Sequence, residues 1–256
     1  VLWVVLSACG FEGEPTPVLQ QSQRATTTTN GTNLNGTNLN GPSLSSTLAA
    51  VSYSGATLPS GPLSSVWLDG SMLRGTRDTE SFSGTDFIGA EFLAKRGDGT
   101  DVHVKINAVT PPPSGSDVWM YDVIALGESG GEAPICAGTG TVLAVAVAGR
   151  WEYQTGVPGG GGKLADSTVF TFGCTGAAIE KCVRMGYRPW ASHQGTSLDP
   201  YHQACVRLIR ADFCGDGVSY TTDGRTINLY DRLGIQVDDS AWFMEAEWDT
   251  TGARCI

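Results

Sequence analysis

The fold is set by the stretch DVHVKINA at residues 101–108. Apolar and polar side chains alternate through it, so valine, isoleucine and alanine share one face and charged or polar groups share the other. A period of two residues is typical of a β-strand with one buried face. We therefore predict a half-buried strand here and expect the side chain of His103 to face solvent.

Further strand candidates follow this stretch toward the C-terminus. They are short runs rich in apolar residues, at 118–126, 141–147, 168–172, 225–230 and 241–248. The prolines at 111–113 and the glycines at 159–162 are typical of loops between such strands. The chain from about residue 95 onward is therefore predicted to be rich in β-structure.

Two segments of this region have the pattern of a helix instead. The first runs from about residue 176 to 185 and places Cys182 on its apolar face. The second begins at Asp199, with Pro200 at its first helical position, and directs Cys205 inward. We predict a disulfide between the two helices, from Cys182 to Cys205. The predicted fold class is α+β, with a β-rich C-terminal domain and two disulfide-linked helices.

The first ten residues form an apolar stretch that contains Leu-Ser-Ala-Cys at positions 6–9. An apolar run closing on small residues is typical of a secretory signal, because a membrane span needs about 20 apolar residues. The ending resembles the bacterial lipobox, which implies cleavage before Cys9 and acyl chains on that cysteine. We interpret residues 1–9 as a truncated lipoprotein signal; the alternative is a chance apolar N-terminus on a fragment.

The chain has seven cysteines, and setting Cys9 aside leaves an even number. Thiols of exported proteins are usually oxidised in pairs, so we predict that the other six form disulfides. Their spacing does not match the close Cys and His pairs of a zinc site. The six are Cys136, Cys174, Cys182, Cys205, Cys214 and Cys255.

The N-terminal region before residue 95 has a different composition. Residues 10–29 are rich in Thr, Gln and Pro, which predicts a solvated tether. Residues 30–94 are predicted to form a stalk in which a bulky apolar residue recurs at every fifth position. This period resembles the pentapeptide repeat, which implies a short irregular β-solenoid over 56–94, whereas 24–47 is expected to be flexible. The recurring residues are Leu34, Leu39, Leu44, Leu58, Leu63, Leu68, Leu73, Phe82, Phe87 and Phe92.

The segment ADFC at residues 211–214 lies within the longer run YHQACVRLIRADFCGDG, residues 201–217. This run is similar to the signature of the ADYC domain family, which is named for Ala-Asp-Tyr-Cys and is seen mostly in exported proteins of myxobacteria. FTFGC at 170–174 and GYRPW at 186–190 are similar as well, whereas Phe213 replaces the namesake tyrosine. The resemblance covers residues 95–256 and implies the envelope of a Gram-negative bacterium. The family is functionally uncharacterised, so the resemblance implies no catalytic residue.

Three carboxylates follow the second helix. Asp212, Asp216 and Asp223 occupy positions 1, 5 and 12 of an EF-hand-like count, with glycine at position 6 but cysteine at position 3. One interpretation is therefore a Ca²⁺ site with three carboxylates. The alternative is local, with Asp212 paired to Arg207 or Arg210 and a turn at Asp216. No other cofactor is predicted.

The net charge and the absence of known catalytic motifs reduce the number of possible function classes. The chain has 16 Lys+Arg against 26 Asp+Glu and a net charge of −10, which argues against a nucleic-acid partner. No nucleophile elbow, phosphate-binding loop or zinc-protease motif is present. Trp190, Tyr201 and His202 are candidate binding residues, because aromatic side chains beside polar ones make faces that bind glycans or peptides.

We therefore expect a lipid-anchored protein of the outer membrane or cell surface with a binding or structural role. Its expected partners are the membrane, through the lipid, and an envelope glycan or protein. The alternative is a hydrolase of envelope polymers that uses the acidic turn at Asp212 and Asp216.

Overall fold

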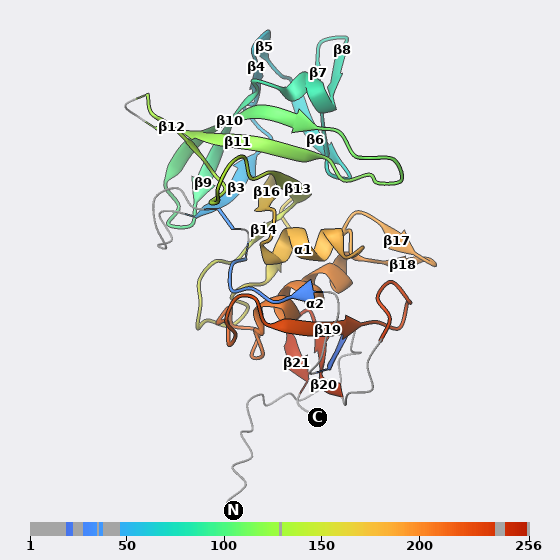
Figure 1. Cartoon of the computed structure of the whole chain (residues 1–256). Helices are drawn as coiled ribbons and strands as arrows, with labels where there is room; N and C mark the ends of the chain where they lie inside the picture. The colour runs from blue at the N-terminus through green and yellow to red at the C-terminus, as the bar shows by residue number, and fades with distance from the viewer. Residues whose placement is uncertain are drawn as a thin grey trace, which may run out of the picture. The chain divides into compact units, whose positions relative to one another are not determined.

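A computed structural model describes residues 19–22, 28–34, 36–37, 47–127, 130–238 and 244–254 of the 256-residue chain. The chain divides into two compact units that interleave along the sequence. The barrel unit comprises residues 35–153 and 163–180, and the helix unit comprises residues 1–34, 154–162 and 181–256 (Figure 1).

Six strands of the barrel unit close into a ring. Every neighbouring pair in it is antiparallel, and β9 pairs with both β10 and β3, so the described ring has no free edge. The fold is therefore dominated by a closed six-stranded β-barrel, and the predicted α+β class is wrong. In order around the ring, the strands are β9 (Glu91–Arg96), β10 (Asp101–Thr110), β11 (Met120–Leu126), β13 (Ala144–Ala148), β16 (Val169–Cys174) and β3 (Leu48–Ser52).

The fold-class prediction failed because two barrel strands come from the region interpreted as a stalk. Both β3 and β9 begin before residue 95, and the ring cannot close without them. The described α-helices are short, α1 at Ala178–Arg184 and α2 at Asp199–Arg210. None of the helices in the described ranges is long and apolar enough to cross a membrane.

Strand β10 shows how the sequence builds the barrel core. Val104 and Ile106 are buried and His103 is exposed, which confirms the predicted strand and its orientation. A bulge between Ile106 and Ala108 then shifts the register, so that Val109 is the next buried residue. A β-bulge adds one residue to a strand, and a pattern of strict alternation does not reveal it.

Aromatic side chains fill the barrel interior. Phe170 of β16 contacts Phe92 of β9 edge-on, with ring centroids 5.7 Å apart, and contacts Phe172 at 5.1 Å. Tyr121 of β11 is fully buried, and its hydroxyl donates a hydrogen bond to the carbonyl oxygen of Ser71 at 2.8 Å. Burial raises the pKa of this phenol. The interior is thus a close-packed core, as expected for a barrel of this size.

Residues 57–87 form hairpins instead of the predicted β-solenoid. Strands β6, β7 and β8 make an antiparallel sheet, whereas the coils of a solenoid stack in parallel. Leu68 and Leu73 recur at a spacing of five because they face each other across the β6–β7 hairpin. The copies at Leu39 and Leu44 lie outside the described residues. The elements here are β4 (Thr57–Leu58), β5 (Gly61–Pro62), β6 (Ser65–Asp69), β7 (Met72–Arg77), β8 (Glu80–Ser83) and the 3-10 turn η2 (Gly84–Phe87).

Short strands complete the barrel unit. β12 (Glu132–Pro134) extends the sheet beside β11, and β14 (Arg150–Trp151) forms a hairpin with β15 (Lys163–Leu164). The inner face of the β6–β8 sheet contributes Val66 and Leu73 to the same hydrophobic core as the barrel strands. That sheet therefore has one face packed on the core and one face toward solvent.

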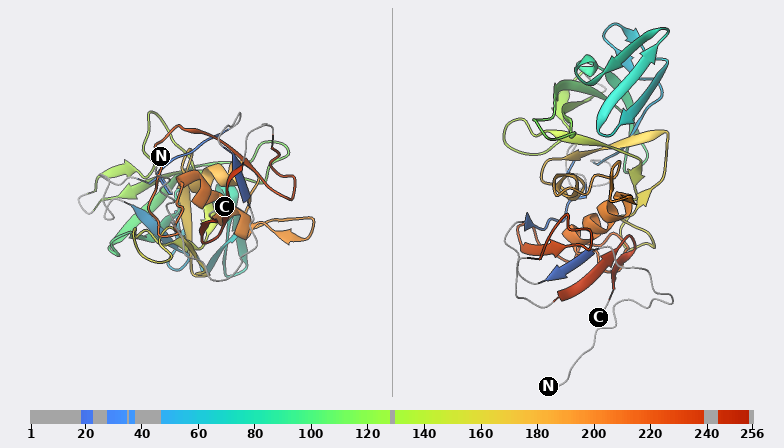
Figure 2. Two further views of the ribbon diagram at one scale, coloured as in Figure 1. Left: turned by 90° about the horizontal axis from the view of Figure 1, so that it is seen from below. Right: turned by 90° about the vertical axis from the view of Figure 1, so that its right-hand side faces the viewer.

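The helix unit contains a five-stranded antiparallel sheet in the order β2–β19–β1–β20–β21 (Figure 2). β1 and β2 come from residues 19–22 and 28–29, which corrects the prediction of a solvated tether there. Leu19 is buried in this sheet, and a composition rich in Thr and Gln did not reveal that burial. The strands are β1 (Leu19–Ser22), β2 (Thr28–Thr29), β19 (Thr226–Tyr230), β20 (Met244–Asp249) and β21 (Gly252–Arg254), with a separate hairpin of β17 (Ser192–His193) and β18 (Thr196–Ser197).

Candidate functional site

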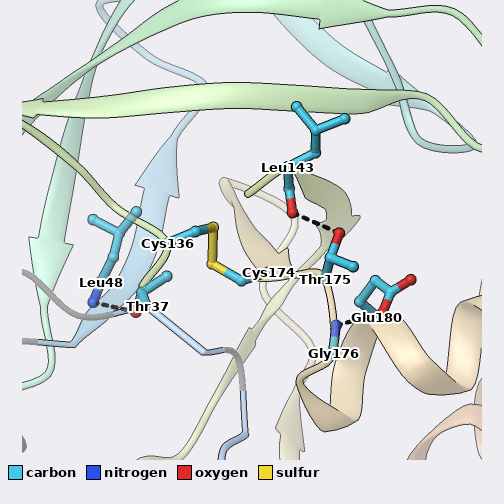
Figure 3. Close-up of a disulfide and its surroundings, with 8 residues drawn as sticks. All are labelled: Thr37, Leu48, Cys136, Leu143, Cys174, Thr175, Gly176 and Glu180. Carbon is cyan, nitrogen blue, oxygen red and sulfur yellow. Dashed lines mark hydrogen bonds between the residues drawn. A yellow bond between two sulfur atoms is a disulfide. The ribbon is translucent and has the colours of Figure 1, made fainter. Parts of the chain in front are cut away.

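Two disulfides join described cysteines. The bond between Cys182 of α1 and Cys205 of α2, with Cα atoms 5.8 Å apart, confirms the predicted pairing. A second bond joins Cys136, in the loop after β12, to Cys174 at the end of β16, with Cα atoms 5.6 Å apart (Figure 3). All four cysteines are buried, so both bonds are structural crosslinks.

The surroundings of Cys136–Cys174 consist of backbone and hydroxyl contacts (Figure 3). Thr37 forms a β-bridge with Cys136, and its hydroxyl accepts a hydrogen bond from the amide of Leu48 at 2.9 Å. On the other side, the hydroxyl of Thr175 donates to the carbonyl oxygen of Leu143 at 2.9 Å. The carboxylate of Glu180 accepts a further hydrogen bond from the amide of Gly176 at 2.8 Å, and together these contacts fix the loops around the crosslink.

The remaining cysteines are not tested by the described residues. Cys214 is partly buried in the turn after α2, and Cys9 and Cys255 lie outside the described ranges. Lipidation of Cys9 and disulfide formation by Cys214 and Cys255 therefore stay predictions.

The acidic turn begins where α2 ends. Ala211 caps the helix with a left-handed backbone, φ 51°, and turns the chain so that Asp212 lies against the last turn of the helix. Asp212 is completely buried and forms ion pairs with Arg207 and with Arg210, whose Nη1 lies 3.7 Å from its Oδ2. The amides of Asp216 and Gly217 also donate to this carboxylate, each at 3.1 Å. The local alternative for Asp212 is therefore confirmed.

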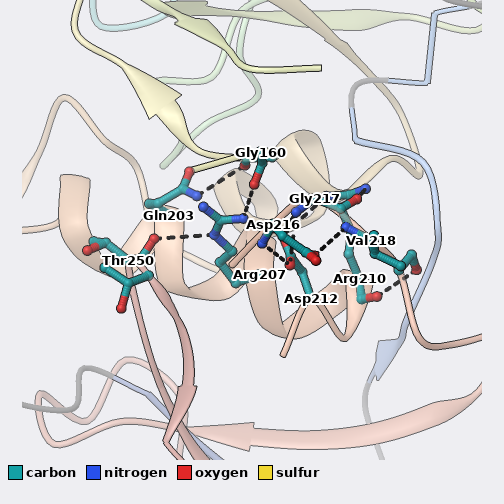
Figure 4. A network of polar contacts seen from close by, with 12 residues as sticks. Gly160, Gln203, Arg207, Arg210, Asp212, Asp216, Gly217, Val218 and Thr250 are labelled. Atoms are coloured by element: carbon teal, nitrogen blue, oxygen red, sulfur yellow. Dashed lines mark hydrogen bonds and ion pairs between the residues drawn. The ribbon is translucent and has the colours of Figure 1, made fainter. Parts of the chain in front are cut away.

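Arg207 extends this network to two other segments of the helix unit (Figure 4). Its guanidinium donates to the carbonyl oxygen of Gly160 and, through Nε, to that of Thr250 at 3.2 Å. Gly160 itself lies so close to the turn that a Cβ atom there would be 2.2 Å from the carbonyl oxygen of Asp216. Buried charges need such complete pairing, because an unpaired ion in the interior is strongly unfavourable. The network is thus a structural centre of the helix unit.

The proposed Ca²⁺ ligands do not converge. Asp212 is occupied by the two arginines, and Oδ1 of Asp216 accepts the amide of Val218 at 3.0 Å in a local turn. Asp223 instead accepts hydrogen bonds from the amide and hydroxyl of Thr32, at 2.7 and 3.0 Å. Within the described residues, no group of three or more His, Cys, Asp or Glu side chains is placed to hold a metal ion.

The three candidate binding residues on and near α2 differ in exposure. His202 is completely buried, and Tyr201 and Trp190 are partly buried. Tyr201 stacks on Tyr187, with ring centroids 6.3 Å apart, and the hydroxyl of Tyr187 donates to Asp231 at 2.6 Å. Burial raises the pKa of Tyr187, with a further contribution from Asp231. The aromatic pair contributes to packing, and His202 is not accessible to a ligand.

An exposed aromatic residue lies elsewhere, on the solvent face of the β6–β8 sheet. Trp67 of β6 is 41% exposed, whereas Trp151 and Trp248 are buried and Trp242 lies outside the described residues. Sequence reasoning missed Trp67 because it fell in the presumed stalk. Polar side chains surround it on the same face, and we call this set the Trp67 face: Ser65, Trp67, Asp69, Arg74, Thr76 and Ser81.

Hydrogen bonds order the Trp67 face. Arg74 lies directly across from Trp67 in the neighbouring strand, and its Nε donates to Asp69 at 2.8 Å. The hydroxyls of Ser65 and Thr76 are hydrogen-bonded at 2.7 Å. The face therefore presents an aromatic ring beside a guanidinium, a carboxylate and several hydroxyls on one three-stranded sheet.

A second candidate surface is the mouth of the barrel. Two cavities, of about 210 and 300 Å³, share Arg96 in their walls. The smaller is also lined by Val102 and Ala125, and the larger by Lys95 and Arg150. Ligand pockets commonly lie at barrel mouths and have volumes from about 300 Å³ upward, so the larger cavity reaches the lower end of that range. Sequence reasoning did not single out any of these residues.

Comparison with known families assigns most of the chain to a known domain family. A family model described as the ADYC domain matches residues 84–256. The chain belongs to the ADYC domain family. No curated protein and no solved structure was found to match the chain. The matched part of the ADYC domain begins with η2, so that β3 and the β6–β8 sheet precede it.

The namesake motif of this ADYC domain, residues 211–214, has a structural role in the chain. Asp212 organises Arg207 and Arg210, as described above. Phe213, which replaces the tyrosine, contacts the buried ring of Trp248 with centroids 5.0 Å apart. The motif thus closes the end of α2 onto β20.

Proposed function

We propose that this ADYC protein is an exported binding protein of the cell envelope, held at the outer membrane or cell surface of a Gram-negative bacterium by a lipid on Cys9. Two buried disulfides support export, because such bonds persist in oxidising compartments and are rare in the cytosol. The lipobox-like ending at residues 6–9 supports the lipid anchor.

The ligand we propose is an envelope glycan, and the Trp67 face is the observation that carries this proposal. A partly exposed tryptophan ring on a sheet offers an apolar surface to the C–H face of a sugar ring. Arg74, Asp69 and the neighbouring hydroxyls supply the donors and acceptors that sugar hydroxyls require. The buried side of the same sheet holds this face in place through Val66 and Leu73.

We do not propose a hydrolase that uses the acidic turn. Such an enzyme needs an accessible acid or base in a cleft. Asp212 is completely buried and paired with two arginines, and His202 is also buried. A binding role needs no such group and agrees with the exposed Trp67 face.

Replacing Trp67 with alanine is expected to weaken binding to glycan polymer at least about tenfold, because central aromatic residues often contribute about 2 kcal/mol or more to an interface. The measurement is co-sedimentation of the full chain with isolated peptidoglycan sacculi and affinity electrophoresis in purified O-antigen polysaccharide. Arg74→Ala should weaken binding as well, by a smaller factor.

The matched control is Ile88→Ala, which removes a 46% exposed apolar side chain outside the Trp67 face and should leave binding unchanged. Binding that survives Trp67→Ala would show that another surface is used. Absence of binding to both polymers would overturn the glycan proposal.

Mass spectrometry of the protein isolated from membranes tests the anchor. The expected N-terminal peptide begins at Cys9 and carries the mass of acyl chains, because lipobox cleavage precedes the modified cysteine. A control digest with Cys9→Ala should yield no acylated peptide. A mature chain that retains residues 1–8 without acylation would contradict the proposal.

A further inference from the structure

Arg96 occupies an unusual place for an arginine. On β9 the side chains of Phe92 and Ala94 point into the barrel and are almost completely buried. Arg96 follows two residues later, and alternate residues of a strand share a face. The guanidinium therefore continues the inward face at the point where the apolar core ends, in the wall between the two mouth cavities.

The Arg96 side chain has hydrogen-bonding capacity that the protein does not use. Its Nε is buried, and among the described residues it has no hydrogen-bond partner. No carboxylate in the described part of the chain lies within ion-pair distance of its guanidinium. A buried donor left without an acceptor costs about 1–3 kcal/mol, so such donors are uncommon unless a ligand or water accepts from them.

The other charges at the mouth are already balanced. Lys95 forms an ion pair with Asp101 at 2.5 Å, and Arg150 lies 3.4 Å from Asp166. Hydrogen bonds from Thr168 hold the pKa of Asp166 below its usual value, so this carboxylate stays ionised beside Arg150. Glu152 adds a further negative charge to the larger cavity. Asp98, two residues after Arg96, offsets part of the positive charge of Arg96 through space but forms no ion pair with it, so among these cations Arg96 is the one without an ion pair to a described carboxylate.

We propose that the barrel mouth binds an oxyanion, a carboxylate or phosphate group, through Arg96. The planar guanidinium matches the two oxygens of such a group, and charge-assisted hydrogen bonds of this kind are about twice as strong as neutral ones. The uncharged part of the ligand lies in one of the two cavities beside Arg96, against Val102 and Ala125 in the smaller or against Trp151 in the larger. This site is separate from the Trp67 face and does not depend on the glycan proposal.

Calorimetric titration of the full chain with D-glucuronate, D-glucose and inorganic phosphate tests the site. Glucuronate and glucose share a ring and differ in the carboxylate, so glucuronate and phosphate are expected to bind and glucose is not. Arg96→Gln should weaken glucuronate binding at least tenfold, and Arg96→Lys, which keeps the charge but loses the planar fork, should weaken it less. Arg232→Gln, at a 62% exposed side chain, is the matched control and should bind as the wild type does.

Melting temperatures show whether a variant that does not bind is still folded. Without ligand, Arg96→Met is expected to be as stable as the wild type or more stable, because it removes a buried donor without a partner. With glucuronate, the melting temperature of the wild type should rise and that of Arg96→Met should not.

A titration with alginate, an acidic polysaccharide, shows whether the bound carboxylate group belongs to a polymer or to a small molecule.

The proposal would be overturned by equal binding of glucose and glucuronate, or by full glucuronate binding to Arg96→Gln. Failure of all three anionic probes to bind would also overturn it. Trp67→Ala should bind glucuronate normally, so failure at one surface is distinguishable from failure at the other.

Discussion

Replacing Arg207 with alanine is expected to lower the free energy of unfolding by about 3–5 kcal/mol, because it leaves the buried carboxylate of Asp212 without its main partner. The same change removes the hydrogen bonds that Arg207 donates to Gly160 and Thr250. Arg207→Lys should cost less than alanine, since it keeps the charge but not the forked donors. Urea unfolding followed by circular dichroism measures the loss, and hydrogen exchange at the amides of α2 locates it.

The matched control is Arg232→Ala. Arg232 is 62% exposed and lies 3.6 Å from Glu247, which also has Arg254 as a partner at 4.0 Å, so the loss of this solvated arginine is expected to cost about 0–1 kcal/mol. If Arg207→Ala unfolds at the same urea concentration as Arg232→Ala, the network around Asp212 is not a structural centre.

Removing the disulfide between the helices, with Cys182→Ala and Cys205→Ala together, is expected to cost about 3–4 kcal/mol. The bond closes a loop with a sequence separation of 23 residues, and the crosslink limits the conformations of the unfolded chain. Both cysteines are completely buried, so the lost sulfur atoms add a packing term of the same sign. Thermal and urea unfolding of the double variant against wild type measure the difference.

The bond between Cys136 and Cys174 provides the comparison, because it closes a longer loop of 38 residues in the barrel unit. Its removal should cost a similar amount but act on the barrel strands, as hydrogen exchange of β16 would show. A helix unit that keeps its stability without Cys182–Cys205 would contradict the chain-entropy argument for this bond.

Local patterns predicted local structure well and long-range pairing poorly. The alternation at residues 101–108 is a property of one strand, and the strand formed as predicted. Closure of the barrel depends on β9 pairing with β3, more than 40 residues earlier in the chain, and no local pattern specifies that partner. The five-residue period led to the wrong prediction for the same reason. Both an antiparallel hairpin and a solenoid can place a bulky residue in a core at every fifth position, so the period alone does not distinguish them.

The same difference between local and long-range information applies to the candidate sites. The disulfide between Cys182 and Cys205 was predictable because each lies on the apolar face of a helix. The three carboxylates of the Ca²⁺ interpretation do not converge in the described residues, because Asp223 accepts hydrogen bonds from Thr32, and a spacing count cannot reveal a contact so distant in sequence. The position of Arg96 could have been noticed in the sequence, because it continues the alternation of the inward-facing Phe92 and Ala94. An arginine on an otherwise apolar strand face is uncommon and therefore indicates a special role.

The position of β1 in the sheet of the helix unit limits how far the protein reaches. Leu19, its first residue, follows Cys9 by ten residues, and a fully extended chain of ten residues spans at most about 35 Å. With a lipid on Cys9, the helix unit would therefore stay within that distance of the bilayer, whereas the stalk expected from composition would have carried it much farther. Under this proposed anchoring, the helix unit would meet the polymers that coat its own cell and would not reach those of a neighbouring cell.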